Sequence, residues 1–190
     1  MDLLLVQASP HVQGVNDFIL DLLLANLPAN LTTKTLFLRT AKIAPCSGCR
    51  KCQSPPHICP LDEQNDDAQK LLLSIQEAKN LIFLAPIYFY HLPAKAKALI
   101  DRAQRFWVNP SETQKQPKKP SLVILTAART KGQFLFQGAL LTLKYFLQCL
   151  GREITNSYLL QGLDTRDDLL AQPKTLATLQ NLLTKELARS

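Results

Sequence analysis

Short runs of apolar residues alternate along the chain with longer segments in which apolar residues recur at helical spacing. The short runs predict strands over residues 2–7, 34–39, 81–85, 121–126 and 153–160. The longer segments predict helices over residues 15–27, 64–78, 93–106, 134–150 and 173–188. Strands and helices that alternate in this way indicate parallel strands joined by right-handed crossovers. We therefore expect an α/β fold with a five-stranded parallel sheet in the order 2-1-3-4-5.

The predicted elements fit one domain over residues 1–190. The chain has 190 residues, and 46% of them are hydrophobic, which is enough for a core on both faces of one sheet. The segment from about residue 40 to residue 65 breaks the simple alternation, because it is too long for an ordinary connection between a strand and a helix. Long loops of this kind usually carry function.

The net charge and the length of the apolar runs limit the kinds of molecule that the protein is expected to bind. A net charge of +7 suits a phosphorylated cofactor, an acidic protein or nucleic acid. The basic residues are scattered, however, and their densest run, residues 115–120, contains no aromatic residue, which argues against nucleic acid. The apolar run 81–90 is too short to span a membrane, and the N-terminus lacks the basic segment of a signal peptide. We expect a cytoplasmic protein that binds neither nucleic acid nor membrane.

Three loops follow the first, third and fourth predicted strands. In an open parallel sheet, ligands bind beyond the carboxyl ends of the strands, where the strand order reverses. With the order 2-1-3-4-5, that point lies between the first and third strands. The loops that follow Gln7, Ala85 and Thr126 should therefore meet around one site.

The first of these loops, residues 8–16, leads from a strand into the start of a helix. The free amide groups and the dipole at such a helix start can hold a phosphate, and Ser9, His11 and Asn16 add polar side chains. The loop lacks the glycines of a dinucleotide fingerprint and the lysine of a P-loop. An ordinary turn with polar capping residues would give the same pattern.

The second and third loops suit a flat, partly apolar ligand. Tyr88, Phe89 and Tyr90 follow one another at the end of a buried strand, where a cofactor ring, the core or a dimer contact could use them. Residues 126–133 combine small residues with Arg129 and Lys131. This third pattern fits either close approach to a ligand or a flexible basic turn.

Four segments together resemble a known family. These are Ser9-Pro10 with Gly14, the cysteine-rich run 46–52, the run 85–89 (Ala-Pro-Ile-Tyr-Phe) and the block 92–102. Their order and spacing resemble the NADPH-dependent FMN reductase branch of the flavodoxin-like superfamily over nearly the whole chain. The resemblance implies a three-layer flavodoxin-like fold, FMN as cofactor and NAD(P)H as substrate. It also implies a homo-oligomer, a dimer or a tetramer.

The resemblance further implies which residues surround FMN. The residues around the phosphate would be Ser9, His11, Gly14, Val15 and Asn16. Those along the isoalloxazine ring would be Pro86, Ile87, Tyr88 and Phe89, with Thr126, Ala127, Ala128 and Arg129 closing its other side. No residue is expected to act as a catalytic acid or base, because the flavin itself accepts the hydride.

The chain also departs from the family pattern. Family members usually read Ser-Pro-Arg and Gly-Asn-Ser or Gly-Asn-Thr in the first loop, whereas this chain has His11 for the arginine and Val15-Asn16 for Asn-Ser. A full positive charge and a hydroxyl group are therefore missing, which predicts weaker FMN binding. The third loop also lacks the glycine pair often seen in the family.

Four cysteines of the long insertion have the spacing C-x2-C-x2-C-x6-C: Cys46, Cys49, Cys52 and Cys59. So tight a group in a cytoplasmic chain is no disulfide framework, and it suits iron–sulfur or zinc ligation. It resembles the compact motif of the iron–sulfur flavoproteins, in which a 4Fe–4S cluster lies beside FMN. Related reductases carry similar segments without an assigned cluster, so a 4Fe–4S cluster, zinc and unligated or redox-active thiols all remain open. Cys149, alone on an apolar helix, is expected in the core.

Two groups of charged residues, one in the insertion and one after it, are expected to have structural roles. The acidic group Asp62, Glu63, Asp66 and Asp67 is expected to stabilise the start of the following helix. For Asp101 and Arg102, a local ion pair is the plainer interpretation and a contribution to a subunit contact is the alternative.

These features predict an FMN-dependent oxidoreductase. It would transfer electrons between NAD(P)H, or a ferredoxin-like donor, and an acceptor that is either a small molecule or a protein. With a bound cluster it would act as an iron–sulfur flavoprotein that converts between two-electron and one-electron carriers. A non-enzymatic metal or thiol module on the same scaffold is the alternative.

Overall fold

The computed structural model describes residues 1–28, 30–110 and 116–182. Its centre is one sheet of parallel strands in the order β2-β1-β3-β4-β5. The strands are β1 (Leu3–Gln7), β2 (Thr33–Phe37), β3 (Asn80–Pro86), β4 (Lys119–Ala127) and β5 (Arg152–Gln161). Both the parallel sheet and the order predicted from the sequence are confirmed.

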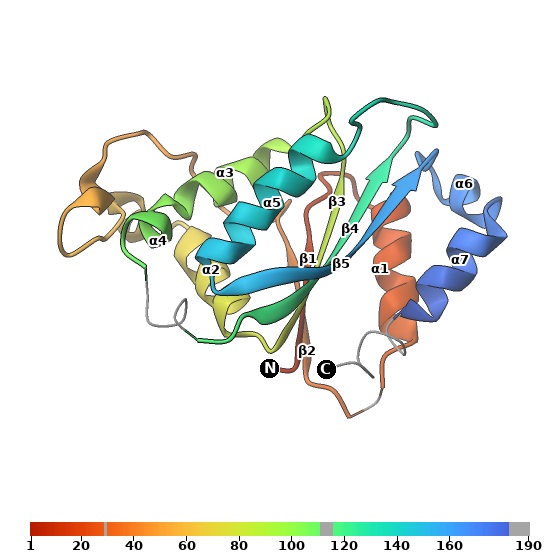
Figure 1. The fold of residues 1–190 in the computed structure, drawn as a ribbon, viewed down its shortest axis with the longest axis horizontal. Helices are drawn as coiled ribbons and strands as arrows, with labels where there is room; N and C mark the ends of the chain where they lie inside the picture. Colours follow the sequence, from red (N-terminus) through yellow and green to blue (C-terminus); the bar gives the residue numbers. More distant parts are fainter. Residues whose placement is uncertain (29, 111–115, 183–190) are drawn as a thin grey trace.

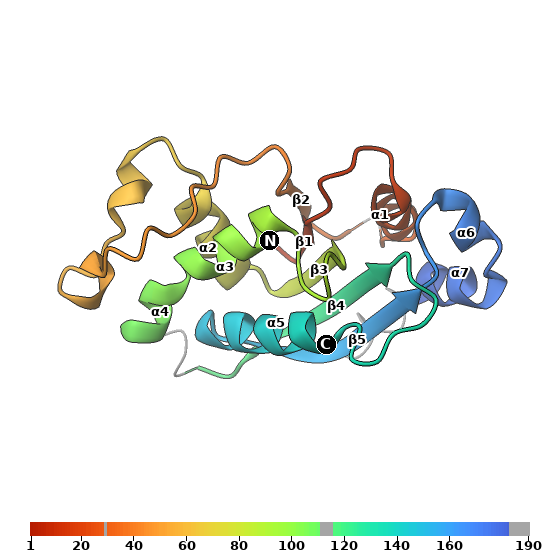
Figure 2. The same ribbon diagram turned by 90° about the horizontal axis from the view of Figure 1, so that it is seen from above.

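Helices cover both faces of this sheet (Figures 1 and 2). One face carries α1 (Val15–Ala25), α6 (Arg166–Leu170) and α7 (Pro173–Gln180). The other carries α2 (Ala68–Glu77), α3 (Ala94–Arg102), α4 (Gln104–Val108) and α5 (Gln137–Cys149). The result is the three-layer flavodoxin-like architecture. Among the described helices, none is both long and apolar enough to cross a membrane.

The core follows from the alternation of side chains along each strand. In β1, Leu4 and Val6 point to the cluster beneath α2, α3 and α5, whereas Leu3 and Leu5 point to the cluster beneath α1 and α7. All four are at most 1% exposed. Strands buried on both faces read as continuous apolar runs, which is why the short runs located them correctly.

Several helix boundaries differ from the prediction. α2 begins at Ala68 because Asn65 has a left-handed backbone (φ 54°), and α5 begins at Gln137 because Phe134 does too (φ 61°). The single helix predicted over residues 93–106 is two helices that meet at Ala103. The short α6 was not predicted, and residues 183–188 of the last predicted helix lie outside the described residues.

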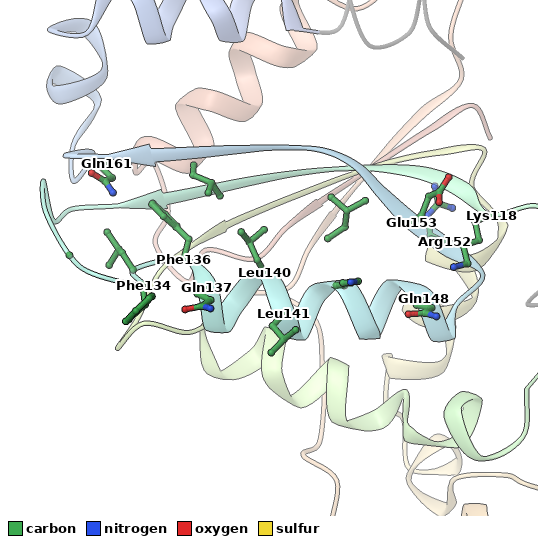
Figure 3. A pocket seen from close by; sticks show the side chains of 15 residues that line it. Lys118, Phe134, Phe136, Gln137, Leu140, Leu141, Gln148, Arg152, Glu153 and Gln161 are labelled. Atoms are coloured by element: carbon green, nitrogen blue, oxygen red, sulfur yellow. The ribbon is translucent and has the colours of Figure 1, made fainter.

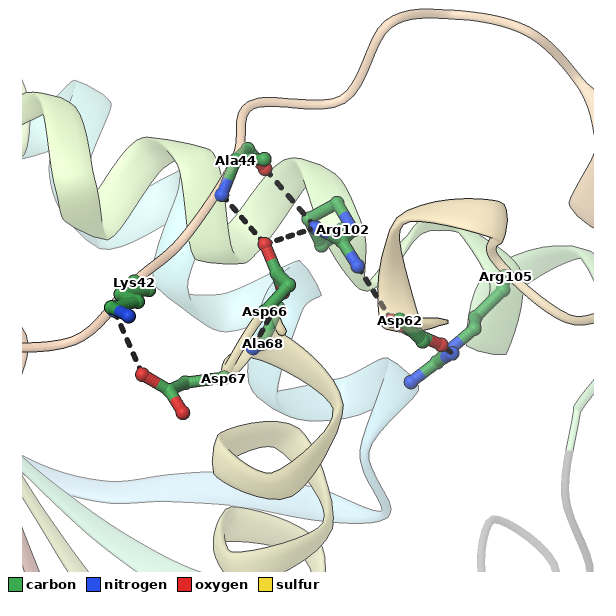
Figure 4. A network of polar contacts seen from close by, with 8 residues as sticks. All are labelled: Lys42, Ala44, Asp62, Asp66, Asp67, Ala68, Arg102 and Arg105. Carbon is green, nitrogen blue, oxygen red and sulfur yellow. Dashed lines mark hydrogen bonds and ion pairs between the residues drawn. The ribbon is translucent and has the colours of Figure 1, made fainter. Parts of the chain in front are cut away.

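The long insertion between β2 and α2 is anchored by buried arginines (Figure 4). Arg102 donates hydrogen bonds to the carboxylates of Asp62 (2.5 Å) and Asp66 (2.9 Å) and to the carbonyl oxygen of Ala44 (3.1 Å). Arg105 pairs with Asp62 as well. The prediction for Asp62 was therefore wrong, because its carboxylate pairs with two arginines and does not cap a helix.

The ion pair expected between Asp101 and Arg102 was also wrong. Neighbours in a helix point about 100° apart, so the two side chains diverge. Asp101 pairs with Lys97 one turn earlier, at 2.5 Å, while Arg102 turns inward to the insertion.

Candidate functional site

The loops that follow β1, β3, β4 and β5 surround a cavity of about 300 Å³ at the carboxyl edge of the sheet. Its lining residues are Ser9, His11, Val12, Gly14, Val15, Asn16, Pro86, Ile87, Tyr88, Thr126, Ala128, Leu163 and Asp164. A second cavity of about 250 Å³ is lined by Ile87, Phe89, Tyr90, Ala127, Ala128, Arg129 and Leu135. Because Ile87 and Ala128 line both, the two cavities adjoin. Each of the residues expected around FMN lines one or the other.

One end of the first cavity is polar and rich in backbone donors. Gly14 is the N-cap residue of α1 and offers no side chain to the amide groups of Val15 and Asn16 that follow it. These amides and the positive end of the helix dipole are what an anion binds at a helix start. Ser9 lies beside them, almost buried, and its Oγ accepts a hydrogen bond from the His11 amide at 3.2 Å.

Buried hydrogen bonds lock the loops to one another. The side-chain amide of Asn16 donates to Thr126 Oγ1 at 2.9 Å, and both residues are at most 3% exposed. The Ile87 amide donates to the Thr126 carbonyl oxygen at 2.8 Å, and the Leu163 amide to that of Ala127 at 2.9 Å. The cavity is therefore held by contacts that span four loops, and its shape is fixed by the fold.

The second cavity is apolar and flanked by a strained turn. Tyr88 and His91 pair as a narrow hairpin, with reciprocal amide-to-carbonyl bonds of 2.8 and 2.9 Å. The two residues between them, Phe89 and Tyr90, both have positive φ, 48° and 62°. Bulky side chains rarely adopt this conformation, and such strain gathers at functional sites. Phe89 is fully exposed at the tip, and the Arg129 guanidinium lies 5.8 Å from the centre of the Tyr90 ring.

Tyr88 lines the first cavity together with Asp164 of the loop after β5. Burial raises the pKa of Tyr88, and the negative charge of Asp164 raises it further. Its ring approaches the His11 ring edge-on, with 6.4 Å between the ring centres. The phenol thus stays protonated at neutral pH and remains a hydrogen-bond donor.

The sequence reasoning missed some lining residues. Leu163 and Asp164 follow β5, and only the loops after the first, third and fourth strands had been examined for a site. The signal was available, because β5 is also parallel and ends at the same edge of the sheet. Val12 and Leu135 carry no chemical signal that a sequence pattern could have revealed.

The two cavities together suit FMN. A phosphate matches the helix start with its free donors, and a flat ring matches the apolar space beside Ile87 and Ala128. Small-molecule sites usually occupy roughly 300–1,000 Å³. The first cavity, about 300 Å³, reaches this range alone, and the second, about 250 Å³, adds to it. The residues of this chain therefore fit the cofactor.

The family described as NADPH-dependent FMN reductase matches residues 1–150 of the chain, well over half of its length. The chain belongs to the NADPH-dependent FMN reductase family. The FMN-dependent NADH-azoreductase of Bacillus anthracis, solved in complex with FMN, has a similar structure with a TM-score of 0.67. That likeness covers 97% of this chain and 99% of the azoreductase at 14% identity, so it establishes the fold alone.

Two curated relatives of this FMN reductase family member are named iron–sulfur flavoproteins. The protein from Methanocaldococcus jannaschii is 27% identical over 129 residues, which are 67% of this chain and 63% of the relative. The protein from Methanosarcina thermophila is 34% identical over 71 residues, 37% of this chain and 35% of the relative. The chain thus spans less than two thirds of the length of either relative.

The cysteine-bearing insertion of this family member forms a lobe beside α4 at one end of the long axis (Figures 1 and 2). Cys46 and Cys49 are exposed, and Cys52 and Cys59 are half-buried. Burial raises the pKa of the Cys52 thiol, and the charges of the other three cysteines add to this, so the four sulfurs lie within electrostatic range of one another. Hydrogen bonds from the Lys51 amide and the Ser47 side chain lower the pKa of Cys49.

The four thiols suit a metal by their chemistry, although they do not converge tightly. Across the described residues, no three His, Cys, Asp or Glu side chains are grouped closely enough to hold a single metal ion. Thiolates ligate both iron–sulfur clusters and zinc, so the donor types alone do not choose between the two.

A larger cavity of the same chain lies between α5 and β5 (Figure 3). Its volume is about 690 Å³, and apolar side chains such as Phe134, Leu140 and Leu141 line it, with Leu140 pointing from α5 toward the strand. Three charged side chains, Lys118, Arg152 and Glu153, lie together at its far end. The start of α5, at Phe136 and Gln137, also lines this cavity.

Proposed function

We propose that this protein is an FMN-dependent oxidoreductase that transfers electrons from NAD(P)H, or from a ferredoxin-like donor, to a separate acceptor. The observation that carries the proposal is the meeting of the loops after β1, β3 and β4 around two adjoining cavities, one polar and one apolar. Membership of the NADPH-dependent FMN reductase family supports it. The donor, the acceptor and the choice of NADH or NADPH are for experiment to assign.

Each loop has its own role in this proposal. The amides at the start of α1, with Ser9 and Asn16, hold the phosphate. Pro86, Ile87, Tyr88 and Phe89 lie along the ring, and residues 126–129 close its other side. The Tyr88 phenol donates a hydrogen bond and stays neutral because burial raises its pKa.

The chemistry of the reaction belongs to the cofactor. Bound FMN accepts a hydride and passes electrons on, so the chain needs no acid–base pair for this half-reaction. Its residues bind the phosphate and orient the ring between the loops after β3 and β4. Phe89, fully exposed at the tip of its turn, stands at the solvent edge of this site, where a substrate would approach. Ala128 matters because its small side chain leaves the passage between the two cavities free.

The test is flavin binding with a matched pair of variants. We expect the purified protein to bind FMN and to bleach its visible absorbance when NADH or NADPH is added under anaerobic conditions. Ala128→Leu should abolish FMN binding by filling the junction, without disturbing packing because Ala128 is exposed. Ala177→Leu, the same change on the exposed surface of α7, should leave binding intact. Protein that stays colourless with excess FMN would refute the proposal.

We further propose that the cysteine-bearing insertion holds a 4Fe–4S cluster. The names of the two curated relatives and the cysteine spacing support this, and zinc or unligated thiols are the other outcomes of the test. Anaerobically purified protein should contain iron and acid-labile sulfide, and Cys52→Ala should lose both while Cys149→Ala, deep in the core, keeps them. Zinc in place of iron would refute the cluster, and protein that holds zinc but binds no flavin would favour the non-enzymatic module.

We also propose that the protein is a homo-oligomer that buries the outer face of α5. Leu141 and Tyr145 on α5, together with Trp107 on α4, are about half exposed, between 49% and 58%. The cavities on either side of α5, about 690 and 520 Å³, leave apolar surface that a second chain could cover. Tyr145→Lys should lower the mass measured by light scattering, and Leu24→Lys, on the opposite layer, should not.

A further inference from the structure

The Asp17 carboxylate, which lines neither cavity, holds the loop after β1 in place. Asp17, in the first turn of α1, accepts hydrogen bonds from the Gln7 side-chain amide and from Arg39 (2.8 Å) at one oxygen. Its other oxygen accepts the Gln13 backbone amide at 2.8 Å. Gln7 is fully buried, and its side-chain oxygen Oε1 accepts a hydrogen bond from the Ser9 amide at 2.6 Å. Asp17 thus joins α1, β1 and the loop after β1.

Arg39 supplies the positive charge that faces Asp17, and three contacts fix its position. It follows β2, and its guanidinium lies 4.4 Å from the centre of the Phe37 ring. A second hydrogen bond, 3.4 Å long, runs from Arg39 to the carbonyl oxygen of His11 in the loop. Lys95 donates to the backbone carbonyl of Arg39 at 2.7 Å, which fixes the chain at this point. Arg39 and Asp17 form a part-buried pair with side chains 16% and 15% exposed.

Without Arg39, the Asp17 carboxylate would weaken the binding of an anion at the start of α1. A carboxylate in the first turn of α1 competes with a phosphate for the same helix dipole, and it repels a dianion placed at the helix start. The pairing with Arg39 cancels that charge, and the bond to His11 keeps the loop in position. Removing Arg39 alone would leave an unpaired carboxylate beside the anion site.

We propose that Arg39 is a positioning residue that lets the chain discriminate flavins by their phosphate, because it neutralises Asp17 and fixes the loop around the start of α1. This inference rests on the proposed function. The preference for FMN over riboflavin then depends on Arg39, which follows the end of β2 and lines neither cavity. The ligand class is a flavin with a terminal phosphate.

The experiment compares the dissociation constants of FMN and riboflavin, measured by quenching of flavin fluorescence. Arg39→Gln should weaken FMN binding about tenfold, equal to roughly 1.4 kcal/mol, and should change riboflavin binding by no more than about twofold. Arg39→Lys keeps the charge and should stay close to the wild type. Lys79→Gln, which changes the net charge equally but pairs with Asp2 at the opposite edge of the sheet, is the control and should change neither constant.

A double variant shows whether Arg39 acts by neutralising the Asp17 carboxylate or through its own contact with the loop. If Arg39 acts by neutralising Asp17, Asp17→Asn should restore most of the FMN affinity lost in Arg39→Gln. A double variant as weak as the single one, or equal losses for both flavins, would overturn the inference. A wild type that binds both flavins equally would refute this inference and leave the proposed function standing, whereas a wild type that binds neither would refute both.

Discussion

The strongest test of the fold around the cysteines is to replace Arg102. This arginine holds both ends of the insertion, the start through the Ala44 carbonyl oxygen and the end through Asp62 and Asp66. Its side chain is 1% exposed and those of the two aspartates are at most 5% exposed. Arg102→Met keeps the length and apolar stem of the side chain but removes every one of these bonds.

The expected magnitude follows from the burial of the pair. Breaking a buried ion pair by removing one partner costs about 3–5 kcal/mol, because the other charge is left uncompensated. Asp62 keeps Arg105, so Asp66 bears most of this cost. The insertion can open without the sheet unfolding, so the loss should appear mainly as local opening. A cost of about 3 kcal/mol corresponds to a roughly hundredfold rise in the open population.

Trypsin provides the assay, because Arg50 and Lys51 are exposed within the insertion. Cleavage there should be roughly a hundredfold faster in Arg102→Met than in the wild type if cleavage requires opening. Arg102→Met combined with Asp66→Asn should recover part of the protection, since no unpaired carboxylate remains. Equal cleavage rates in wild type and Arg102→Met would refute the reasoning.

The same pair gives the insertion a dependence on pH. Burial alone would raise the pKa of Asp66, but hydrogen bonds from the Ala44 and Ala68 amides and from Arg102 outweigh it and hold this pKa below its usual value. A carboxyl with a lowered folded-state pKa stabilises the fold fully above its unfolded pKa, about 3.9, and loses that contribution as the pH falls through the lowered value. Opening of the insertion should therefore set in below about pH 4 in the wild type. Asp66→Asn should lack this step.

Three further outcomes are expected. Thr126→Val should lower the free energy of unfolding in urea by about 1–3 kcal/mol, because it leaves the buried Asn16 amide without its partner. Gly138→Ala should weaken FMN binding in a fluorescence titration, because the added Cβ would lie 3.2 Å from the Tyr90 carbonyl oxygen and displace the strained turn. In native protein, Cys149 should resist alkylation that reaches the exposed cysteines, because burial raises its pKa to about 11; mass spectrometry of the labelled protein would check this.

The centre of the sheet could be predicted from the sequence because β1, β3 and most of β4 are buried on both faces. Such strands are short apolar runs, and their alternation with helices leaves few topologies to consider. Helix ends were less predictable, because they depend on single backbone conformations such as those at Asn65 and Phe134. Nothing in the helical pattern of residues 93–106 indicates that the helix breaks at Ala103.

The candidate site was predictable in outline for a topological reason. Knowing the strand order is enough to bring the loops after β1, β3 and β4 together, whatever their side chains do. Long-range side-chain pairs were not predictable in this way. Arg102 was expected to pair with its neighbour Asp101, and it pairs instead with aspartates about 40 residues away in the sequence. The spacing of residues within one helix does not indicate which residues from distant parts of the sequence it will contact.

The polar end of the site relies on backbone geometry more than on charge. His11 and Asn16 replace residues that would bring a full charge and a hydroxyl group, yet the start of α1 keeps its amides because Gly14 offers them no competing side chain. The nearest ion pair, Asp17 with Arg39, is neutral as a whole. Affinity for a phosphate should then depend on how rigidly the loop is held, and the buried bonds from Gln7 to Ser9 and Asp17 are what hold it. A chain can thus lose a charged ligand residue and keep its anion site, provided that the loop stays fixed.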